Sequence, residues 1–163
     1  MRLLIIRHAI AVARGTPDVP EEERPLTPRG ERRFRAAARG LARLTRRPDV
    51  LLTSPLRRAR QTADIAAEAC GRIEPREEPA LAGGTVERMA AAIDGHARKR
   101  LVAIVGHEPD VSALLARLLG TSAAERLTFK KGGAALVDVP AGMAGGGALV
   151  WYLPPRVLRR LRG

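Results

Sequence analysis

Two of the three histidines in this chain follow short apolar runs that are typical of buried strands. His8, preceded by Arg7, comes directly after residues 3–6, and His107 follows residues 101–105 and Gly106. In open α/β sheets, ligands bind just beyond the carboxyl ends of the strands. A neutral imidazole can attack phosphorus, and a second, protonated imidazole can balance charge on the equatorial oxygens. The pair is therefore a candidate for phosphoryl chemistry.

Three further groups fit an anionic phosphoryl ligand. Arg58 lies in the expected first turn of the helix after the second strand, and guanidinium groups such as those of Arg7 and Arg58 bind phosphate oxygens two at a time. The backbone of Glu108, at the expected start of a helix, adds amide donors. Each residue also has a structural alternative. A strand-end Arg-His pair can cap backbone carbonyls, and His107 can be an ordinary turn histidine.

The elements that must position these residues alternate along the chain. We expect strands at 3–6, 49–53, 73–76 and 101–105, with helices at about 28–46, 55–70, 86–99 and 110–119. A hairpin of 134–139 with 148–153 and a short basic tail follow. This alternation predicts a three-layer α/β/α sandwich with a mostly parallel central sheet and no large lid insertion. One domain should span 1–163.

Local signals refine the helix starts and one helix surface. Thr27-Pro28 predicts an N-cap with a first-turn proline, and Ser54-Pro55 predicts the same device for the next helix. Residues 10–26, which contain Gly15, Pro17, Pro20 and three consecutive glutamates, predict a long surface loop near the site. A basic ridge follows the first helix at three- and four-residue steps. Its members are Arg32, Arg35, Arg39, Arg43 and Arg46.

The composition limits the function classes. The net charge of +12 is compatible with nucleic acid, an acidic partner, anionic small molecules, or a coding bias toward arginine. Aromatic residues make up only 2% of the chain, which argues against stacking on nucleic acid bases. A single cysteine excludes an intramolecular disulfide. No apolar stretch suits a signal peptide or a membrane span, so we expect a cytoplasmic protein.

The site motifs resemble those of a known family. Arg7-His8 resembles the Arg-His-Gly signature of the histidine phosphatase superfamily, which includes phosphoglycerate mutases. The stretch from Ser54 to Ala63 is similar to the family's Ser-x-Leu-x-Arg-Ala-x-Gln-Thr-Ala signature. Residues 25–30 match its helix start, and Gly106-His107 fits its second histidine. The resemblance covers about residues 1–120 and implies a phosphoglycerate mutase-like fold. The short length and Arg-His-Ala variant are most similar to the phosphohistidine phosphatase SixA subgroup.

The resemblance implies a role for each matched residue. His8 would be the nucleophile, passing through a phosphohistidine intermediate that water hydrolyses. Arg7 and Arg58 would hold the phosphoryl oxygens, and His107 would stabilise their charge as a donor. No cofactor is implied, and no metal either, since the three histidines are scattered and a cationic pocket repels divalent cations.

Two departures from the family pattern matter. Ala9 replaces the signature glycine, which requires only an ordinary backbone angle at this position. Larger members also carry a carboxylate general acid after the second helix, whereas here only Glu78 and Glu87 are candidates, each with a solvated surface charge as its alternative. An alkoxide leaving group needs a proton in the transition state, and the nitrogen of phosphohistidine depends less on a positioned acid. The missing acid favours a P–N substrate.

The sequence thus predicts a cofactor-independent phosphatase acting on a histidine-phosphorylated signalling protein. A phosphomonoesterase of a small metabolite, nucleotide or sugar phosphate is one alternative, and a non-catalytic basic phosphate-binding module is another. Arg32, Arg35 and Arg39 of the ridge could steer an acidic phosphorelay domain. Lys130, with Lys131, could flank the pocket and bind substrate, or form a plain solvated loop. Neither nucleic acid nor membrane is an expected partner, and the sequence leaves the oligomeric state open.

Overall fold

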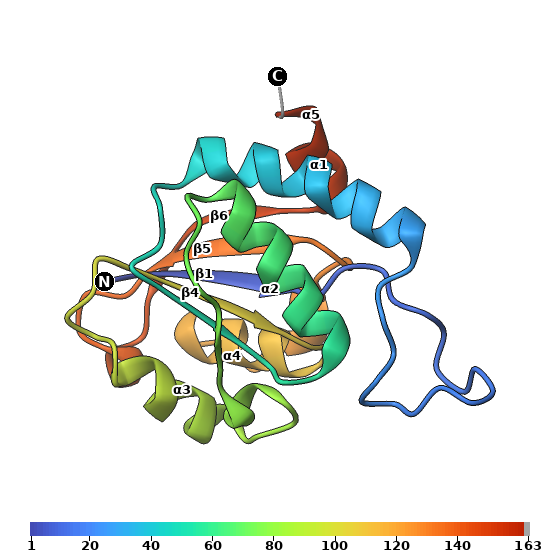
Figure 1. The fold of residues 1–163 in the computed structure, drawn as a ribbon. Helices are drawn as coiled ribbons and strands as arrows, with labels where there is room; N and C mark the ends of the chain where they lie inside the picture. Colours follow the sequence, from blue (N-terminus) through green and yellow to red (C-terminus); the bar gives the residue numbers. More distant parts are fainter. Residues whose placement is uncertain (162–163) are drawn as a thin grey trace.

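The computed structural model describes residues 1–161 and is built on one six-stranded sheet (Figure 1). The strand order is β3-β2-β4-β1-β5-β6. The strands β3, β2, β4 and β1 pair in parallel, whereas β5 and β6 are antiparallel to their neighbours. Their bounds are β1 Arg2–Arg7, β2 Val50–Thr53, β3 Arg76–Glu77, β4 Leu101–Gly106, β5 Ala134–Asp138 and β6 Ala148–Leu153. The predicted mostly parallel sheet and the predicted hairpin are confirmed.

Within residues 1–161, five α-helices cover the two faces of the sheet (Figure 1). On one face lie α1 (Pro28–Leu44), α2 (Arg57–Ala69) and α5 (Pro155–Arg160). On the other lie α3 (Val86–Asp94) and α4 (Asp110–Leu118). The side chains of β1 alternate between the two faces of the sheet. Leu4 and Ile6 pack in the core with α1, α2 and α5, whereas Leu3 and Ile5 pack in the core with α3 and α4. The predicted three-layer α/β/α sandwich is confirmed, and residues 1–161 contain no large lid insertion.

The first helix begins as its sequence predicts and is tightly packed. The Thr27 hydroxyl accepts a hydrogen bond from the Gly30 amide at 2.9 Å, and Pro28 occupies the first turn. Gly40 faces the backbone of α5, where a Cβ would lie 1.9 Å from the Leu158 carbonyl oxygen. A side chain at position 40 would therefore push α5 off α1. Residues 155–160 of the expected basic tail are in fact this helix, packed on α1, and residues 162–163 lie outside the described part of the chain.

Three other predictions of local structure need correction. Ser54 does not cap α2; the cap position is Leu56, and the Ser54 hydroxyl instead bonds to the ring of His107. The helix expected over 86–99 ends at Asp94, because residues 95–98 form turns. The strand expected at 73–76 is shifted toward the C-terminus, to Arg76–Glu77. No helix within residues 1–161 is long and apolar enough to cross a membrane.

Candidate active site

The sheet places the two strand-end histidines next to each other. In the parallel pairing of β1 with β4, Arg7 lies opposite Gly106, so the next residues, His8 and His107, leave neighbouring strands at the same edge. The His8 amide donates to the Gly106 carbonyl at 3.0 Å. The two ring centroids are 5.0 Å apart. Gly106 has a steric role here, because a Cβ would lie 2.9 Å from a methyl group of Val111 in α4.

The contacts of His8 fix which ring nitrogen carries its proton. Nδ1 lies 2.7 Å from the carbonyl oxygen of Ala9. A carbonyl oxygen can only accept, so Nδ1 donates, and in the neutral ring Nε2 keeps its lone pair. The ring is only 6% exposed. Burial, and after it repulsion from the protonated form of His107, lowers the pKa of His8 to about 3. His8 is therefore a neutral imidazole with a free Nε2 at neutral pH.

His107 is held by the residue that was expected to cap α2. Its Nε2 lies 2.7 Å from the Ser54 hydroxyl, which also accepts the amide of Leu56 at 3.2 Å. Within the described residues no other acceptor contacts the Ser54 hydroxyl, so we infer that its hydrogen bonds to Nε2, which leaves the proton of the neutral ring on Nδ1. Within the described residues, this buried Nδ1 has no hydrogen-bond partner. Burial and then the Arg58 charge lower the pKa of His107 to about 4. Its Nδ1 is an uncommitted donor.

The two arginines each keep one donor free as well. Arg7 donates from Nη1 to the carbonyl of Phe129, and Arg58 donates from Nη1 to the carbonyl of Glu21 at 2.8 Å. The Nε atoms of Arg7 and Arg58 are buried and lack a partner within residues 1–161. Burial lowers the pKa of both guanidinium groups, yet arginine remains protonated in proteins. Four predicted residues therefore meet at one sheet edge, and three of them each carry a buried donor atom that has no partner within the described residues.

The first turns of α2 connect this edge to the loop over it. The Thr62 hydroxyl donates to the Arg58 carbonyl at 2.6 Å and accepts the amide of Ala9 at 3.0 Å. The side chain of Gln61 accepts the amide of Leu26 at 2.7 Å, where the loop ends. Ala59 is fully buried against the sheet. Three polar side chains of the Ser54–Ala63 stretch, those of Ser54, Gln61 and Thr62, thus each tether a different part of the site.

A family model describing the histidine phosphatase superfamily (branch 1) matches residues 3–84, the part of the chain that holds His8, Arg58 and their tethers. The chain belongs to this superfamily. An uncharacterized protein of Picosynechococcus sp. is 35% identical over 88% of this chain and 87% of its own length. An uncharacterized protein of Mycobacterium tuberculosis is also 35% identical, over 86% of this chain and 95% of its own.

Solved structures of similar fold agree with the family. The structure of the protein histidine phosphatase SixA complexed with tungstate has a TM-score of 0.82 at 26% identity, covering 97% of this chain and 99% of that one. A protein from Agrobacterium tumefaciens assigned as phosphohistidine phosphatase SixA has a TM-score of 0.81 at 25% identity, covering 94% of this chain and 97% of that one. Histidine phosphatases of the SixA type are therefore close structural neighbours.

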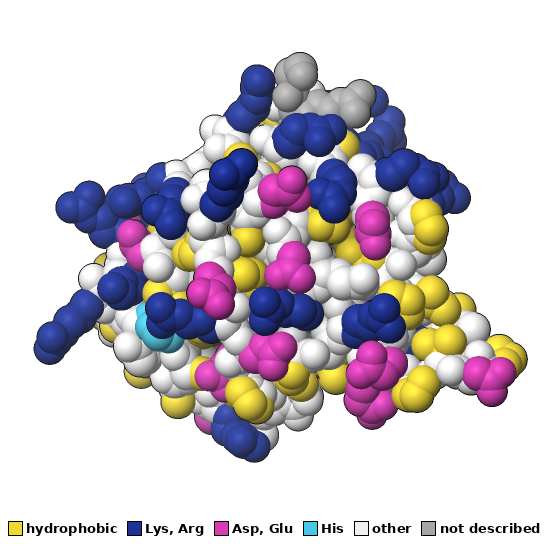
Figure 2. All heavy atoms as spheres, in the orientation of Figure 1, with side chains coloured by type: hydrophobic (Ala, Val, Ile, Leu, Met, Phe, Trp, Pro, Cys, Tyr) yellow, Lys and Arg dark blue, Asp and Glu magenta, His cyan; other side chains and the backbone are white. Residues whose placement is uncertain are grey.

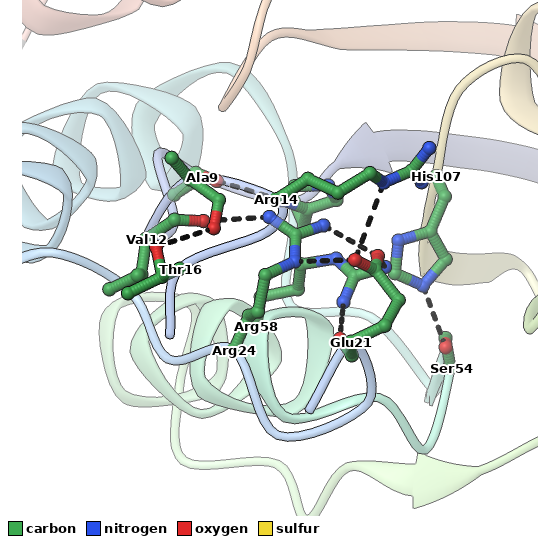
Figure 3. A network of polar contacts seen from close by, with 11 residues as sticks. Ala9, Val12, Arg14, Thr16, Glu21, Arg24, Ser54, Arg58 and His107 are labelled. Atoms are coloured by element: carbon green, nitrogen blue, oxygen red, sulfur yellow. Dashed lines mark hydrogen bonds and ion pairs between the residues drawn. The ribbon is translucent and has the colours of Figure 1, made fainter. Parts of the chain in front are cut away.

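The sequence did not single out the carboxylate that lies within this histidine phosphatase site. Glu21, on the loop of residues 10–26, places its carboxylate among three guanidinium groups (Figure 3). It contacts Arg24 at 2.6 Å, Arg58 at 3.1 Å and Arg14 at 3.3 Å. Hydrogen bonds from Arg24 are the largest cause that lowers the pKa of Glu21 to about 2. A run of three acidic residues near the nucleophile was the available signal, but it did not specify which one turns inward.

Arg24 is the second residue that sequence reasoning missed. It is 7% exposed, and its Nη1 donates to the Val12 carbonyl at 2.7 Å while its other donors bind Glu21. Its charge contributes to the lowered pKa of His107, as the charge of Arg58 does. Arg24 and Glu21 together hold the loop against Arg58. An arginine in an irregular loop has no periodicity that would predict burial.

The remaining predicted residues are engaged in other contacts or exposed. The Glu108 carboxylate accepts hydrogen bonds from the Ser112 hydroxyl and the Phe129 amide, so its side chain supports the loop that Arg7 also contacts. Lys130 is exposed at the edge of a hollow beside the site. Glu78 caps a short 3-10 helix through the amide of Ala80, and Glu87 is exposed in the first turn of α3. Ala9 has no positive φ, since in residues 1–161 only Asp18 and Arg72 do among non-glycine residues. The expectation of an ordinary backbone angle at Ala9 is confirmed.

Proposed function

We propose that this chain is a cofactor-independent phosphatase that forms a phosphohistidine intermediate at His8 and acts on phosphohistidine in proteins. The observation that carries the proposal is the arrangement of a free imidazole nitrogen among uncommitted donors. Nε2 of His8 has a lone pair, while Nε of Arg7, Nε of Arg58 and Nδ1 of His107 lack partners. Buried donors without partners are costly, and such groups collect where a ligand completes them.

The chemistry follows from these groups. Nε2 of His8 attacks phosphorus as the P–N bond of the substrate breaks, and the departing imidazole keeps or takes a proton. The charges of Arg7 and Arg58 neutralise the equatorial oxygens during the transfer, and the neutral ring of His107 stabilises them by donating a hydrogen bond. Water then attacks the phosphorus of the intermediate, the P–Nε2 bond breaks, inorganic phosphate leaves, and neutral His8 is restored. No metal or organic cofactor enters this sequence of steps.

The choice of a P–N substrate rests on the carboxylates. Glu78 is engaged as a helix cap and Glu87 points to solvent from α3, so neither supports proton donation to an alkoxide. Glu21 lies within the site, but its low pKa, about 2, keeps it ionised at neutral pH and unable to donate. Phosphohistidine suits such a site, because its leaving nitrogen is easily protonated. The similarity to a protein histidine phosphatase that binds tungstate, a tetrahedral oxyanion, supports the same choice.

The test compares kcat/KM on a phosphohistidine peptide and on an aryl phosphate for the wild type, His8→Ala and His96→Ala. His96 is the matched control, since it lies in the turn after α3, outside the site. We expect faster turnover of the peptide, loss of both activities in His8→Ala, and none of these losses in His96→Ala. Unchanged turnover in His8→Ala would overturn the nucleophile. A higher kcat/KM on phosphomonoesters would overturn the substrate class.

A further inference from the structure

A solvent-open hollow of about 410 Å³ adjoins the phosphoryl site. Its floor is apolar and includes Ile10, Phe34, Pro154 and Pro155, from the segment after His8, from α1 and from the start of α5. Five of the residues around it are arginine or lysine and none is aspartate or glutamate. The hollow therefore combines an apolar surface with a positively charged rim.

The rim cations are free to bind an external anion. They are Arg33 of α1, Lys130 and Lys131 of the loop before β5, and Arg156 and Arg159 of α5. None of the five forms an ion pair with a carboxylate of residues 1–161. Three separate elements therefore direct unneutralised charge toward one space, a pattern that favours an acidic ligand.

The hollow and the phosphoryl site share a wall. The Gly132 amide lies 3.1 Å from the carbonyl oxygens of both Arg7 and His8, which holds the lysine loop against the end of β1. Next to Gly132, burial and the charges of Arg7, Arg24 and Arg58 lower the pKa of Lys131. A ligand whose phosphoryl group reaches His8 can thus continue over Gly132 into the hollow.

The basic ridge of α1 offers no comparable surface. Arg35 pairs with Glu68 of α2 at 2.7 Å, and Arg39 lies in the same shallow depression as that glutamate. Over α1 and α2, basic side chains are interspersed with acidic ones (Figure 2). Arg33, on another side of the same helix, faces the hollow instead. The expected steering surface is thus better provided by Arg33 and α5 than by Arg32, Arg35 and Arg39.

We propose that this hollow, hereafter the cationic hollow, binds the acidic residues that flank the phosphohistidine of a protein substrate. The inference rests on the proposed function and adds a substrate preference to it. A protein segment fits better than a compact metabolite, because the cations are spread over three elements around an open apolar floor. Glutamate or aspartate side chains can reach the rim while apolar neighbours contact Phe34 and the two prolines.

The test uses two synthetic peptides that differ only in the residues flanking one histidine, a run of glutamates in one and glutamines in the other. Binding of the unphosphorylated, fluorescently labelled peptides is measured by anisotropy, and kcat/KM is measured on the phosphorylated forms. The hollow variant is Arg33→Gln/Lys130→Gln/Arg156→Gln. The matched control, Arg32→Gln/Arg39→Gln/Arg43→Gln, removes the same charge from the exposed ridge. Thermal melting verifies that both are folded.

Each exposed charge pair contributes about twofold, so three pairs together contribute about tenfold. We expect the wild type to prefer the glutamate peptide by about that factor in binding and in kcat/KM, and the preference to weaken at high salt. The preference should disappear in the hollow variant and persist in the ridge variant. Equal loss in both triple variants, or no preference in the wild type, would overturn the cationic hollow. Binding preference without any turnover would instead contradict the proposed function.

Discussion

The phosphoryl site and the cationic hollow are both rich in arginine, but they differ in their counter-ions. In the phosphoryl site, Arg24 and Arg58 are buried and share the carboxylate of Glu21. In the hollow, cations such as Lys130 and Arg156 are exposed, and neither forms an ion pair with a carboxylate of residues 1–161. A buried charge needs a counter-ion because it has lost its water, whereas an exposed one remains hydrated. Burial thus decides which cations of this protein remain free for a partner.

Substitution of Arg58 should give the largest effect on kcat/KM, and this effect should differ in kind from that of the hollow variant. Arg58→Gln removes a charged donor from the phosphoryl pocket, and such a loss costs about 10²- to 10³-fold in rate. We expect kcat/KM to fall by about that factor on the glutamate and glutamine peptides alike, whereas the hollow variant affects mainly the former. Arg60→Gln is the control, since Arg60 pairs with Asp64 at 3.1 Å on the outer side of α2. A fall confined to the glutamate peptide would contradict the assignment of Arg58 to the pocket.

The pH dependence of stability should also originate in the pocket. The folded-state pKa values of about 3 for His8 and about 4 for His107 lie below the ordinary value of 6.5. The unfolded chain therefore binds more protons between pH 6.5 and these values, so the free energy of unfolding falls as pH decreases through this range. Glu21 retains its stabilising contribution until the pH is below its ordinary value of 4.5, since its folded pKa is about 2.

Urea unfolding between about pH 7 and about pH 4.5 measures this effect, since a displaced histidine pKa changes stability by about 1.4 kcal/mol per unit. We expect the wild type to lose at least ~2 kcal/mol over the range. His107→Gln should flatten the dependence, and the hollow variant should leave it unaltered. A free energy of unfolding that stays constant over this range would contradict the buried, neutral state of the two rings.

A smaller effect on the free energy of unfolding is expected when Glu21, the counter-ion of Arg24 and Arg58, is replaced. Glu21→Gln leaves the buried Arg24 and Arg58 without a carboxylate, but Glu21 is itself 36% exposed, which reduces the loss. We expect the free energy of unfolding at neutral pH to fall by about 1–2 kcal/mol. Glu23→Gln provides the control, because the ion pair of Glu23 with Arg57 is long and exposed. An equal effect of the two substitutions would show that Glu21 has no special role in holding the loop.

The sequence predicted the parts of the site that depend on regular structure. His8 and His107 follow apolar runs, and adjacent parallel strands bring such positions together, as the β1–β4 register does. Arg58 could be identified from the sequence because the motif around it contains many matching residues and is specific to the family. Fold class followed from the alternation of strands and helices. In each case a periodic or local pattern specified the position.

The missed features depend on contacts between distant residues. Glu21 and Arg24 lie in an irregular loop, where no periodicity distinguishes an inward side chain from a solvated one. Ser54 precedes a proline, as helix caps do, but its hydroxyl bonds His107, 53 residues along the chain. The six-residue helix α5 is too short to be predicted from propensity, and it packs on the surface that Gly40 leaves open.

Trapping the phosphorylated enzyme tests the central claim most directly. The wild type is mixed with a radiolabelled phosphohistidine peptide, quenched in base within a single turnover, and digested for peptide mapping. We predict one label that is stable in base and labile in acid, located on the peptide that contains His8, and no such label in His8→Ala. A label on any other residue, or substrate turnover without a labelled enzyme, would contradict the account.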